Sequence, residues 1–224
     1  MNFLSHFYFD RHYTDPQFIL GSILPDLLKN ANKNWNLHPD KLAVSFNEDD
    51  RLIKILEGWS RHIQVDRIFH SSEFFMQHTR EIKIEIAPLL INSPVRPSFL
   101  AHVSLELLLD NLLVSNRVID ADDLYSYLGK IYRPALQKFL EFNGIADTPL
   151  FFNFFDRFIR SAYLKSYNEM DHLMYALTRI CMRLWDDPIN DSQRRELSGV
   201  FQKYREKLSG SFMDIFDKIN TELS

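Results

Sequence analysis

Residues 99–113 read FLAHVSLELLLDNLL, a run in which almost every side chain is apolar. Because the apolar residues surround the whole circumference of a helix, the segment predicts a helix that is buried on all sides. Three titratable residues, His102, Glu106 and Asp110, interrupt the run at a spacing of four. Positions i, i+4 and i+8 share a helix face, so these side chains are predicted to project together into the interior.

Two carboxyl groups close together inside a protein are costly to desolvate unless a cation or strong donors compensate them. A divalent metal ion provides that compensation, and a donor set of imidazole and carboxylate suits Zn, Fe, Mn or Ni. An internal network of ion pairs and hydrogen bonds with Arg179 or Arg183 is the structural alternative. The spacing alone leaves both interpretations open.

A second polar stripe occurs in the segment HIQVDRIFH, where His62, Asp66 and His70 again follow one another at a spacing of four. Asp26 ends the apolar segment GSILPD, and His6 lies near the start of the sequence. A single histidine is more often structural than a ligand, but two such stripes in one chain favour a metal site. We expect both stripes to face the same cavity.

The chain is predicted to be all-α, with a single multi-helix domain over residues 1–224. Glycine is scarce, and apolar residues recur at spacings of three and four almost throughout. The predicted helices cover residues 15–29, 48–78, 80–92, 97–117, 121–143, 149–163, 167–185 and 190–220. Residues 31–46 are predicted to form a loop, and His12, His38 and His78 are predicted to be exposed.

Composition and charge exclude several classes of protein. The formal charge of −4 and the isoelectric point near 6.1 provide no field that would attract nucleic acid. No uninterrupted apolar run of about 18 residues spans a membrane, and the start of the sequence lacks the features of a signal peptide. The single cysteine, Cys181, fits a reducing compartment. We therefore expect a cytoplasmic protein without nucleotide-binding, serine-hydrolase or redox motifs.

Five segments carry a resemblance to a known family. They are MNFLSH at residues 1–6, GSILPDLLKN at 21–30, HIQVD at 62–66, LAHVSLE at 100–106 and YNEMDHLMYALTRICMR at 167–183. In these segments, and in their order along the chain, the sequence resembles the acyl carrier protein phosphodiesterases, also called holo-acyl-carrier-protein hydrolases. The matches are spread over most of the chain.

The resemblance implies an all-helical fold that is distantly similar to metal-dependent HD phosphohydrolases. It also implies hydrolysis of the phosphodiester that joins 4'-phosphopantetheine to a serine of holo-acyl carrier protein, a reaction of lipid metabolism and fatty acid biosynthesis. The cofactor would be a divalent metal ion, Mn, Fe, Zn or Ni, with Mg as the alternative. Carried over by position, the expected metal ligands are His6, Asp26, His62, Asp66 and His102.

The sequence departs from the family at two positions of this site. Ala101 stands where the family often has an aspartate before the histidine, and His70 stands where an aspartate often follows the HxxxD segment. Glu106, four residues after His102, is a candidate replacement for the missing carboxylate, an arrangement also similar to zinc-dependent phospholipase C. Three alternatives stay open: another metal-dependent phosphodiesterase, a non-catalytic helical binding protein, and a relative without activity.

Further residues are assigned roles in the expected reaction. His70 or Glu106 would handle the proton of the leaving oxygen, and Arg183 would neutralise charge on the phosphate. Because carrier proteins present acidic helices, an acidic enzyme needs a local basic rim to receive one. The candidates for this rim are Lys29, Lys33, Lys54, Arg61 and Arg67.

Overall fold

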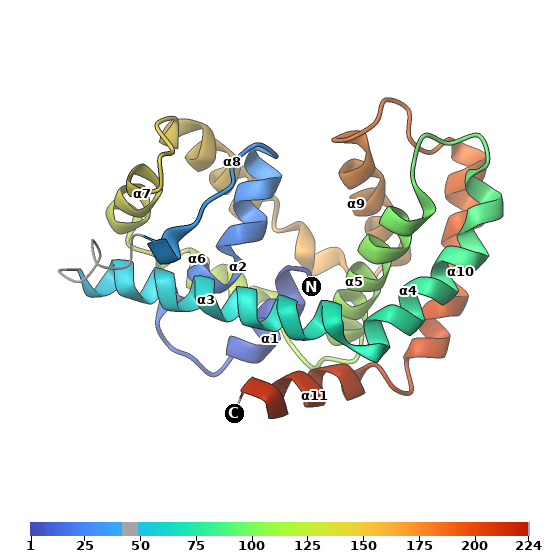
Figure 1. Ribbon diagram of the computed structural model, residues 1–224, viewed down its shortest axis with the longest axis horizontal. Coiled ribbons are helices and arrows are strands. Elements are labelled where there is room, and N and C mark those ends of the chain that lie inside the picture. Colours follow the sequence, from blue (N-terminus) through green and yellow to red (C-terminus); the bar gives the residue numbers. More distant parts are fainter. Residues whose placement is uncertain (42–48, 224) are drawn as a thin grey trace. The chain divides into compact units, whose positions relative to one another are not determined.

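The computed structural model describes residues 1–41 and 49–223, and over this part of the chain the protein is all-α, as predicted (Figure 1). No β-strand occurs among the described residues. The α-helices are α1 (Phe3–Asp10), α2 (Pro16–Ala31), α3 (Asp50–Ser71), α4 (Glu73–Ile86), α5 (Pro97–Ser115), α6 (Ala121–Leu128), α7 (Arg133–Phe142), α8 (Thr148–Ser161), α9 (Met170–Met182), α10 (Asp191–Leu208) and α11 (Met213–Leu223). The predicted loop over 31–46 and the predicted helix start at 48 lie partly outside the described residues.

Contacts divide the chain into two compact units that interleave along the sequence. Unit 1 consists of Met1–Ser5, Arg67–Ile119 and Lys165–Ser224, and unit 2 of His6–Asp66 and Asp120–Leu164. Two of the boundaries between the units fall inside α1 and α3. The single domain over residues 1–224 stays a prediction.

Helix α5 forms the centre of unit 1, where α4, α9 and α10 pack against it. Pro97 lies in its first turn, where the missing N–H costs no hydrogen bond, and the Asn116 side chain donates to the Leu112 carbonyl at its end. The leucines of this helix are buried, as the sequence predicts. The face that carries His102, Val103 and Glu106 is only half-buried, so the prediction of burial on all sides is wrong for that face. By length and composition α5 is able to cross a membrane, but it lies mostly buried, which is typical of core helices in soluble proteins.

In unit 2, α2 packs against α6 and α8 and approaches α3 at two glycines. A Cβ atom at Gly58 would lie 2.1 Å from a backbone carbonyl oxygen of α2, and one at Gly21 would lie 2.3 Å from a carbonyl oxygen of α3. Only glycine at both positions allows the two backbones to come so close. His62 follows one turn after Gly58, so this approach sets how near its side chain lies to α2.

Helix α1 has no counterpart among the predicted helices. An eight-residue helix is too short to be stable alone, and it depends on tertiary contacts. Asp110 provides them, because its carboxylate accepts from the N–H groups of Leu4 at 3.1 Å and Ser5 at 2.8 Å. These are amides of the first helical turn that have no partner within the helix. These bonds fix the start of α1 within unit 1.

Three predicted helices are each interrupted, so those parts of the prediction are wrong; they are 48–78, 121–143 and 190–220. Ser72 starts α4, because its hydroxyl accepts from the Phe75 N–H at 3.0 Å. Gly129 follows α6, and Pro134 lies in the first turn of α7. Gly210 lies between α10 and α11. The spacing of apolar residues continues across these breaks, so it predicts one long helix in each case. Only one or two residues mark each break in the sequence.

Candidate metal centres

Two groups of histidine and carboxylate side chains have the composition of a metal site. We name them the His6 cluster, which contains His6, His62 and Asp66, and the His70 cluster, which contains His70, His102 and Glu106. Within each cluster the three potential ligand atoms lie within 4.8 Å of one another. The first cluster belongs to unit 2 and the second to unit 1. The expectation that both stripes face one cavity joins residues of the two units and stays a prediction.

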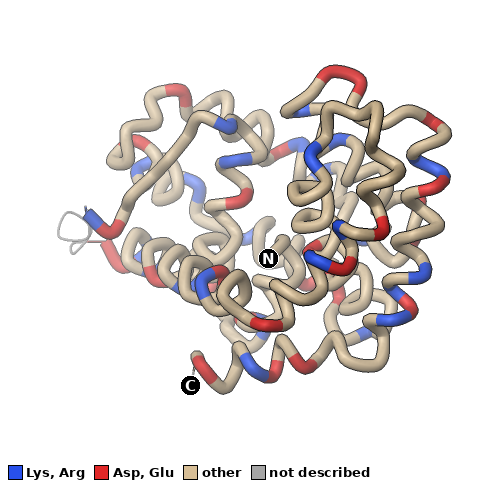
Figure 2. The backbone as a smooth tube through the Cα atoms, turned by 45° about the vertical axis from the view of Figure 1, so that its right-hand side comes forward, with Lys and Arg blue, Asp and Glu red and all other residues tan. Residues whose placement is uncertain are grey.

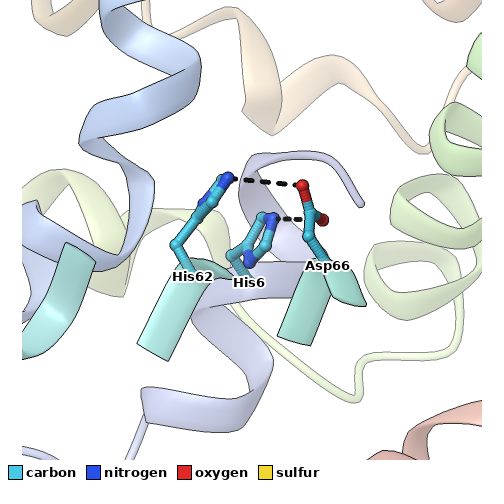
Figure 3. A group of neighbouring side chains, drawn as sticks. All are labelled: His6, His62 and Asp66. Atoms are coloured by element: carbon cyan, nitrogen blue, oxygen red, sulfur yellow. Dashed lines mark ion pairs between the residues drawn. The ribbon is translucent and has the colours of Figure 1, made fainter. Parts of the chain in front are cut away.

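In the His6 cluster, two imidazoles face one carboxylate (Figure 3). His6 Nε2 lies 3.3 Å from Asp66 Oδ1, and His62 Nε2 lies 3.5 Å from Asp66 Oδ2. The two rings stack with their centroids 3.8 Å apart. His62 and Asp66 share a face of α3 at the predicted spacing of four, whereas His6 comes from α1. The helix spacing thus supplies two members of the cluster, and tertiary packing supplies the third.

A backbone carbonyl fixes the orientation of His62. Nδ1 of this ring lies 2.9 Å from the carbonyl oxygen of Ser22, next to Gly21 on α2. Because a carbonyl oxygen only accepts, Nδ1 carries a proton, and Nε2 is the nitrogen directed at Asp66. Metal-binding histidines commonly donate from their second nitrogen to a backbone carbonyl in this way.

Burial and neighbouring charges perturb the pKa values in this cluster. Burial, together with the nearby imidazole of His62, lowers the pKa of His6 to about 3. Burial acts in the same direction on His62, but its hydrogen bond to Asp66 and the charge of Asp26 outweigh it and raise the pKa of His62. Burial opposes ionisation of Asp66, yet its contacts with both imidazoles help to hold its pKa below the usual range. A neutral His6 and an ionised Asp66 therefore offer a lone pair and a negative charge to a cation.

Two aspartates accompany the cluster. Asp26 of α2 acts on His62 through its charge and is not one of the three converging ligands. Asp10 is 1% exposed, and its Oδ1 lies 3.7 Å from Arg61 Nε. Burial raises the pKa of Asp10 to about 6, although the Arg61 charge lowers it. Sequence reasoning missed Asp10, even though its spacing from His6 repeats that of His62 and Asp66.

The His70 cluster is tighter and more accessible. His102 Nε2 lies 3.0 Å from Glu106 Oε1 and 3.1 Å from His70 Nε2, and His70 Nε2 lies 3.2 Å from the same Glu106 oxygen. The amino group of Met1 also lies 3.2 Å from that oxygen. Burial opposes ionisation of Glu106, but the Met1 amino group and the imidazoles lower its pKa below the usual range. The His102 side chain is 42% exposed and that of His70 is 32% exposed.

The three residues of the stripe predicted on α5 have two different roles. His102 and Glu106 join the cluster, whereas Asp110 holds the first turn of α1 and accepts from the Ser5 hydroxyl at 2.6 Å. Burial raises the pKa of Asp110 to about 7 against these hydrogen bonds. Arg179 and Arg183, the partners of the alternative network, are exposed on α9 and at its C-cap. The predicted catalytic role of Arg183 stays a prediction.

The residues of the predicted basic rim are distributed over both units. Lys29, Lys54 and Arg61 belong to unit 2, and Arg67 belongs to unit 1. Lys54 pairs with Glu57 at 2.7 Å, and Arg61 faces a buried aspartate, so two of these cations have carboxylate neighbours. Lys29 and Arg67 are exposed. Figure 2 shows basic and acidic residues interspersed along the described chain.

His78 is buried, so the prediction that it is exposed is wrong, whereas His12 and His38 are exposed as predicted. Nδ1 of His78 lies 2.7 Å from the hydroxyl of Tyr204, a residue of α10. The same hydroxyl lies 2.7 Å from Glu81. This network connects α4 to α10 within unit 1 and gives His78 a structural role.

The residues of the His6 cluster fit a divalent metal ion. Both ring nitrogens of His6 are buried without hydrogen-bond geometry to any partner among the described residues, although Nε2 lies at ion-pair distance from Asp66. Buried polar atoms without partners are costly, and an unobserved ion is one explanation for them. Two imidazoles and a carboxylate suit Zn, Mn, Fe or Ni, and they suit Mg less well because Mg prefers oxygen ligands.

No family model matches this chain, and neither a curated protein nor a solved structure matches it. The resemblance to the acyl carrier protein phosphodiesterases therefore depends on the sequence motifs. An all-helical chain with two clusters of suitable metal ligands is what the described residues establish.

Proposed function

We propose that the protein is a metal-dependent phosphodiester hydrolase whose catalytic ion is held by His6, His62 and Asp66, with Asp26 beside them. The observation that carries the proposal is the convergence of two imidazoles and a carboxylate from α1 and α3, with His6 buried and lacking a hydrogen-bond partner among the described residues. Burying two imidazoles and a carboxylate is costly unless hydrogen bonds or a bound cation compensate them.

The residues of the cluster have separable tasks. A divalent ion in such a site lowers the pKa of a bound water and polarises a phosphoryl oxygen. His6, with its lowered pKa, is neutral at neutral pH and offers a lone pair without first losing a proton. His62 is oriented by the Ser22 carbonyl. Asp66 is 30% exposed, so it connects the buried imidazoles to solvent and to an arriving phosphate.

The proposed substrate is holo-acyl carrier protein, from which the enzyme releases 4'-phosphopantetheine. Support for it comes from the family motifs that contain His6, Asp26, His62 and Asp66. A cytoplasmic location and a place in fatty acid biosynthesis follow from the same proposal. The exposed cations Lys29 and Arg67 are the candidates for contacting the acidic carrier protein.

The experiment that tests the proposal is incubation of the purified protein and Mn²⁺ with holo carrier protein, followed by mass spectrometry of the carrier. We expect a loss equal to one 4'-phosphopantetheine, and no loss with His62→Ala. The control is His12→Ala, which removes an exposed histidine of unit 2 and should retain activity.

Two other results would each redirect the proposal. Unchanged holo protein together with hydrolysis of a small aryl phosphodiester would retain the hydrolase and discard the carrier-protein substrate. No hydrolysis of either substrate with several divalent ions would favour a non-catalytic helical protein.

A further inference from the structure

The His70 cluster has a geometry that hydrogen bonding alone does not explain. Its three ligand atoms form a nearly equilateral triangle with sides of 3.0, 3.1 and 3.2 Å. A carboxylate oxygen offers two lone-pair sites, yet three donor groups lie within 3.2 Å of Glu106 Oε1: the two imidazoles and the Met1 amino group. If both imidazoles donated to this oxygen, their two N–H groups would face each other across 3.1 Å.

The dimensions of the triangle match one face of an octahedral metal ion. Adjacent ligands of an octahedral ion are separated by about 1.4 times the metal–ligand distance, so sides of 3.0 to 3.2 Å correspond to bonds of about 2.2 Å. A tetrahedral ion would require bonds of about 1.9 Å, which is shorter than the roughly 2.0 to 2.1 Å of Zn–N bonds. The triangle therefore favours six-coordination.

Aromatic packing fixes the two imidazoles without blocking the site. The Phe75 ring of α4 meets His70 and His102 edge-on, with centroids 4.9 and 5.0 Å away. Phe69 contacts His70 from within α3 at 5.1 Å. His102 and His70 nonetheless keep substantial exposure, so solvent reaches the two imidazoles.

We propose that His70, His102 and Glu106 form a second metal site, which binds a six-coordinate divalent ion of the Fe²⁺, Mn²⁺ or Ni²⁺ class through one face. Two imidazoles select these ions over Mg²⁺ and Ca²⁺. The three remaining positions are occupied by exchangeable water and accept an anionic oxygen ligand such as phosphate. His70 and Glu106 are then metal ligands instead of the proton-transfer groups that the sequence predicts. The site lies within unit 1 and does not depend on the proposed hydrolase activity.

The test is a titration of tag-free, chelator-treated protein with Co²⁺, followed by absorption spectroscopy and calorimetry. We expect two equivalents to bind, and Glu106→Gln or His70→Ala to remove one of them. In a His62→Ala background one equivalent should remain, with the weak absorption of six-coordinate Co²⁺, and Glu106→Gln should then remove it. The matched control is His172→Ala on α9, which should leave both equivalents in place. The exposed imidazole of His172 lies 3.4 Å from Glu169, and no third ligand joins the pair among the described residues.

Full retention of both equivalents in Glu106→Gln, in protein that circular dichroism shows to be folded, would overturn the second site. Strong absorption typical of four-coordinate Co²⁺ in the His62→Ala background would overturn the octahedral geometry. The variant Glu106→Asp keeps the charge and is the control for misfolding. It should bind the metal more weakly but still bind the full equivalent. Binding is measured without substrate, so absence of hydrolysis would contradict the proposed function and leave the second site standing.

Discussion

The two clusters contain the same ligand types, two imidazoles and one carboxylate, in surroundings of opposite character. In the His6 cluster the imidazoles are 1% and 3% exposed, and one is oriented by a backbone carbonyl. In the His70 cluster they are 32% and 42% exposed, and an aromatic ring orients both. The His6 cluster therefore depends on how closely the backbones of α2 and α3 approach, whereas the His70 cluster depends on the Phe75 side chain.

The largest effect is expected from a methyl group at the close approach of α2 and α3. Gly58→Ala places a Cβ 2.1 Å from the Phe18 carbonyl oxygen, so the helices must separate. We expect a loss of about 3 kcal/mol or more in the free energy of unfolding, together with loss of metal from the His6 cluster alone. Urea denaturation and metal analysis measure both.

The control for this substitution is Gly199→Ala in the exposed part of α10, where an added Cβ meets nothing within 4 Å. It should stabilise the protein by about 0.5 to 1 kcal/mol because alanine favours helices. If Gly58→Ala were equally harmless, the dependence of the His6 cluster on backbone approach would be wrong.

Asp110 lies on α5 together with His102 and Glu106, but it supports α1 and is not a proposed metal ligand. Its effect on stability is therefore measured separately from metal binding. Its pKa is raised from 3.8 to about 7 in the folded protein, so the folded state holds the proton more tightly than the unfolded state. This contribution to stability is complete below about pH 4 and is lost as the pH rises toward 7. Relative to Asp110→Asn, the wild-type free energy of unfolding should fall over this window with a slope of at most about 1.4 kcal/mol per pH unit. A difference that is constant with pH would contradict the raised pKa.

The aromatic support of the His70 cluster predicts a smaller and local effect. Phe75→Leu keeps an apolar side chain but removes the ring that meets both imidazoles. Metal affinity at the His70 cluster should fall about 10-fold, as is usual when a residue that orients ligands is lost. Affinity at the His6 cluster should stay unchanged, and calorimetry of the His62→Ala and Glu106→Gln backgrounds separates the two values. Equal weakening at both clusters would contradict their independence.

The smallest effect concerns surface charge. Lys29→Glu and Arg67→Glu, which reverse exposed cations, should slow turnover of holo carrier protein a few-fold at low salt and less at high salt. Arg61 is unsuitable for this comparison because its reversal would place a second carboxylate beside Asp10. Rates that do not depend on salt in either variant would remove Lys29 and Arg67 as candidates for contacting the carrier protein.

Sequence reasoning predicted those parts of the fold and site that depend on local spacing. The buried character of α5 follows from its leucines, and the pairs His62–Asp66 and His102–Glu106 follow from the spacing of four. The grouping of ligands does not follow from spacing: His70 was assigned to the stripe of His62 and instead contacts His102. At the end of α3, the partner of His70 is decided by how α5 packs against it. The spacing of residues within one helix carries no information about that packing.

Other features were inaccessible for physical reasons. The short helix α1 is formed because Asp110, over one hundred residues away, accepts from its first amides. The carbonyl of Ser22 leaves no trace in the sequence, since every residue has one. The pair Gly21 and Gly58 is visible only as two of six glycines. Asp10 is the exception, because its spacing from His6 was available and could have indicated a third carboxylate.

The proposed role of the His6 cluster is that of a catalytic metal centre. The most direct measurement purifies the protein without chelator, removes the metal, and follows hydrolysis of an aryl phosphodiester as Mn²⁺ is added back. Wild type and His12→Ala should lose turnover with the metal and regain it. His62→Ala should regain none and bind one equivalent fewer. A metal-free wild type that is fully stable and takes up neither Mn²⁺ nor Zn²⁺ would contradict the claim.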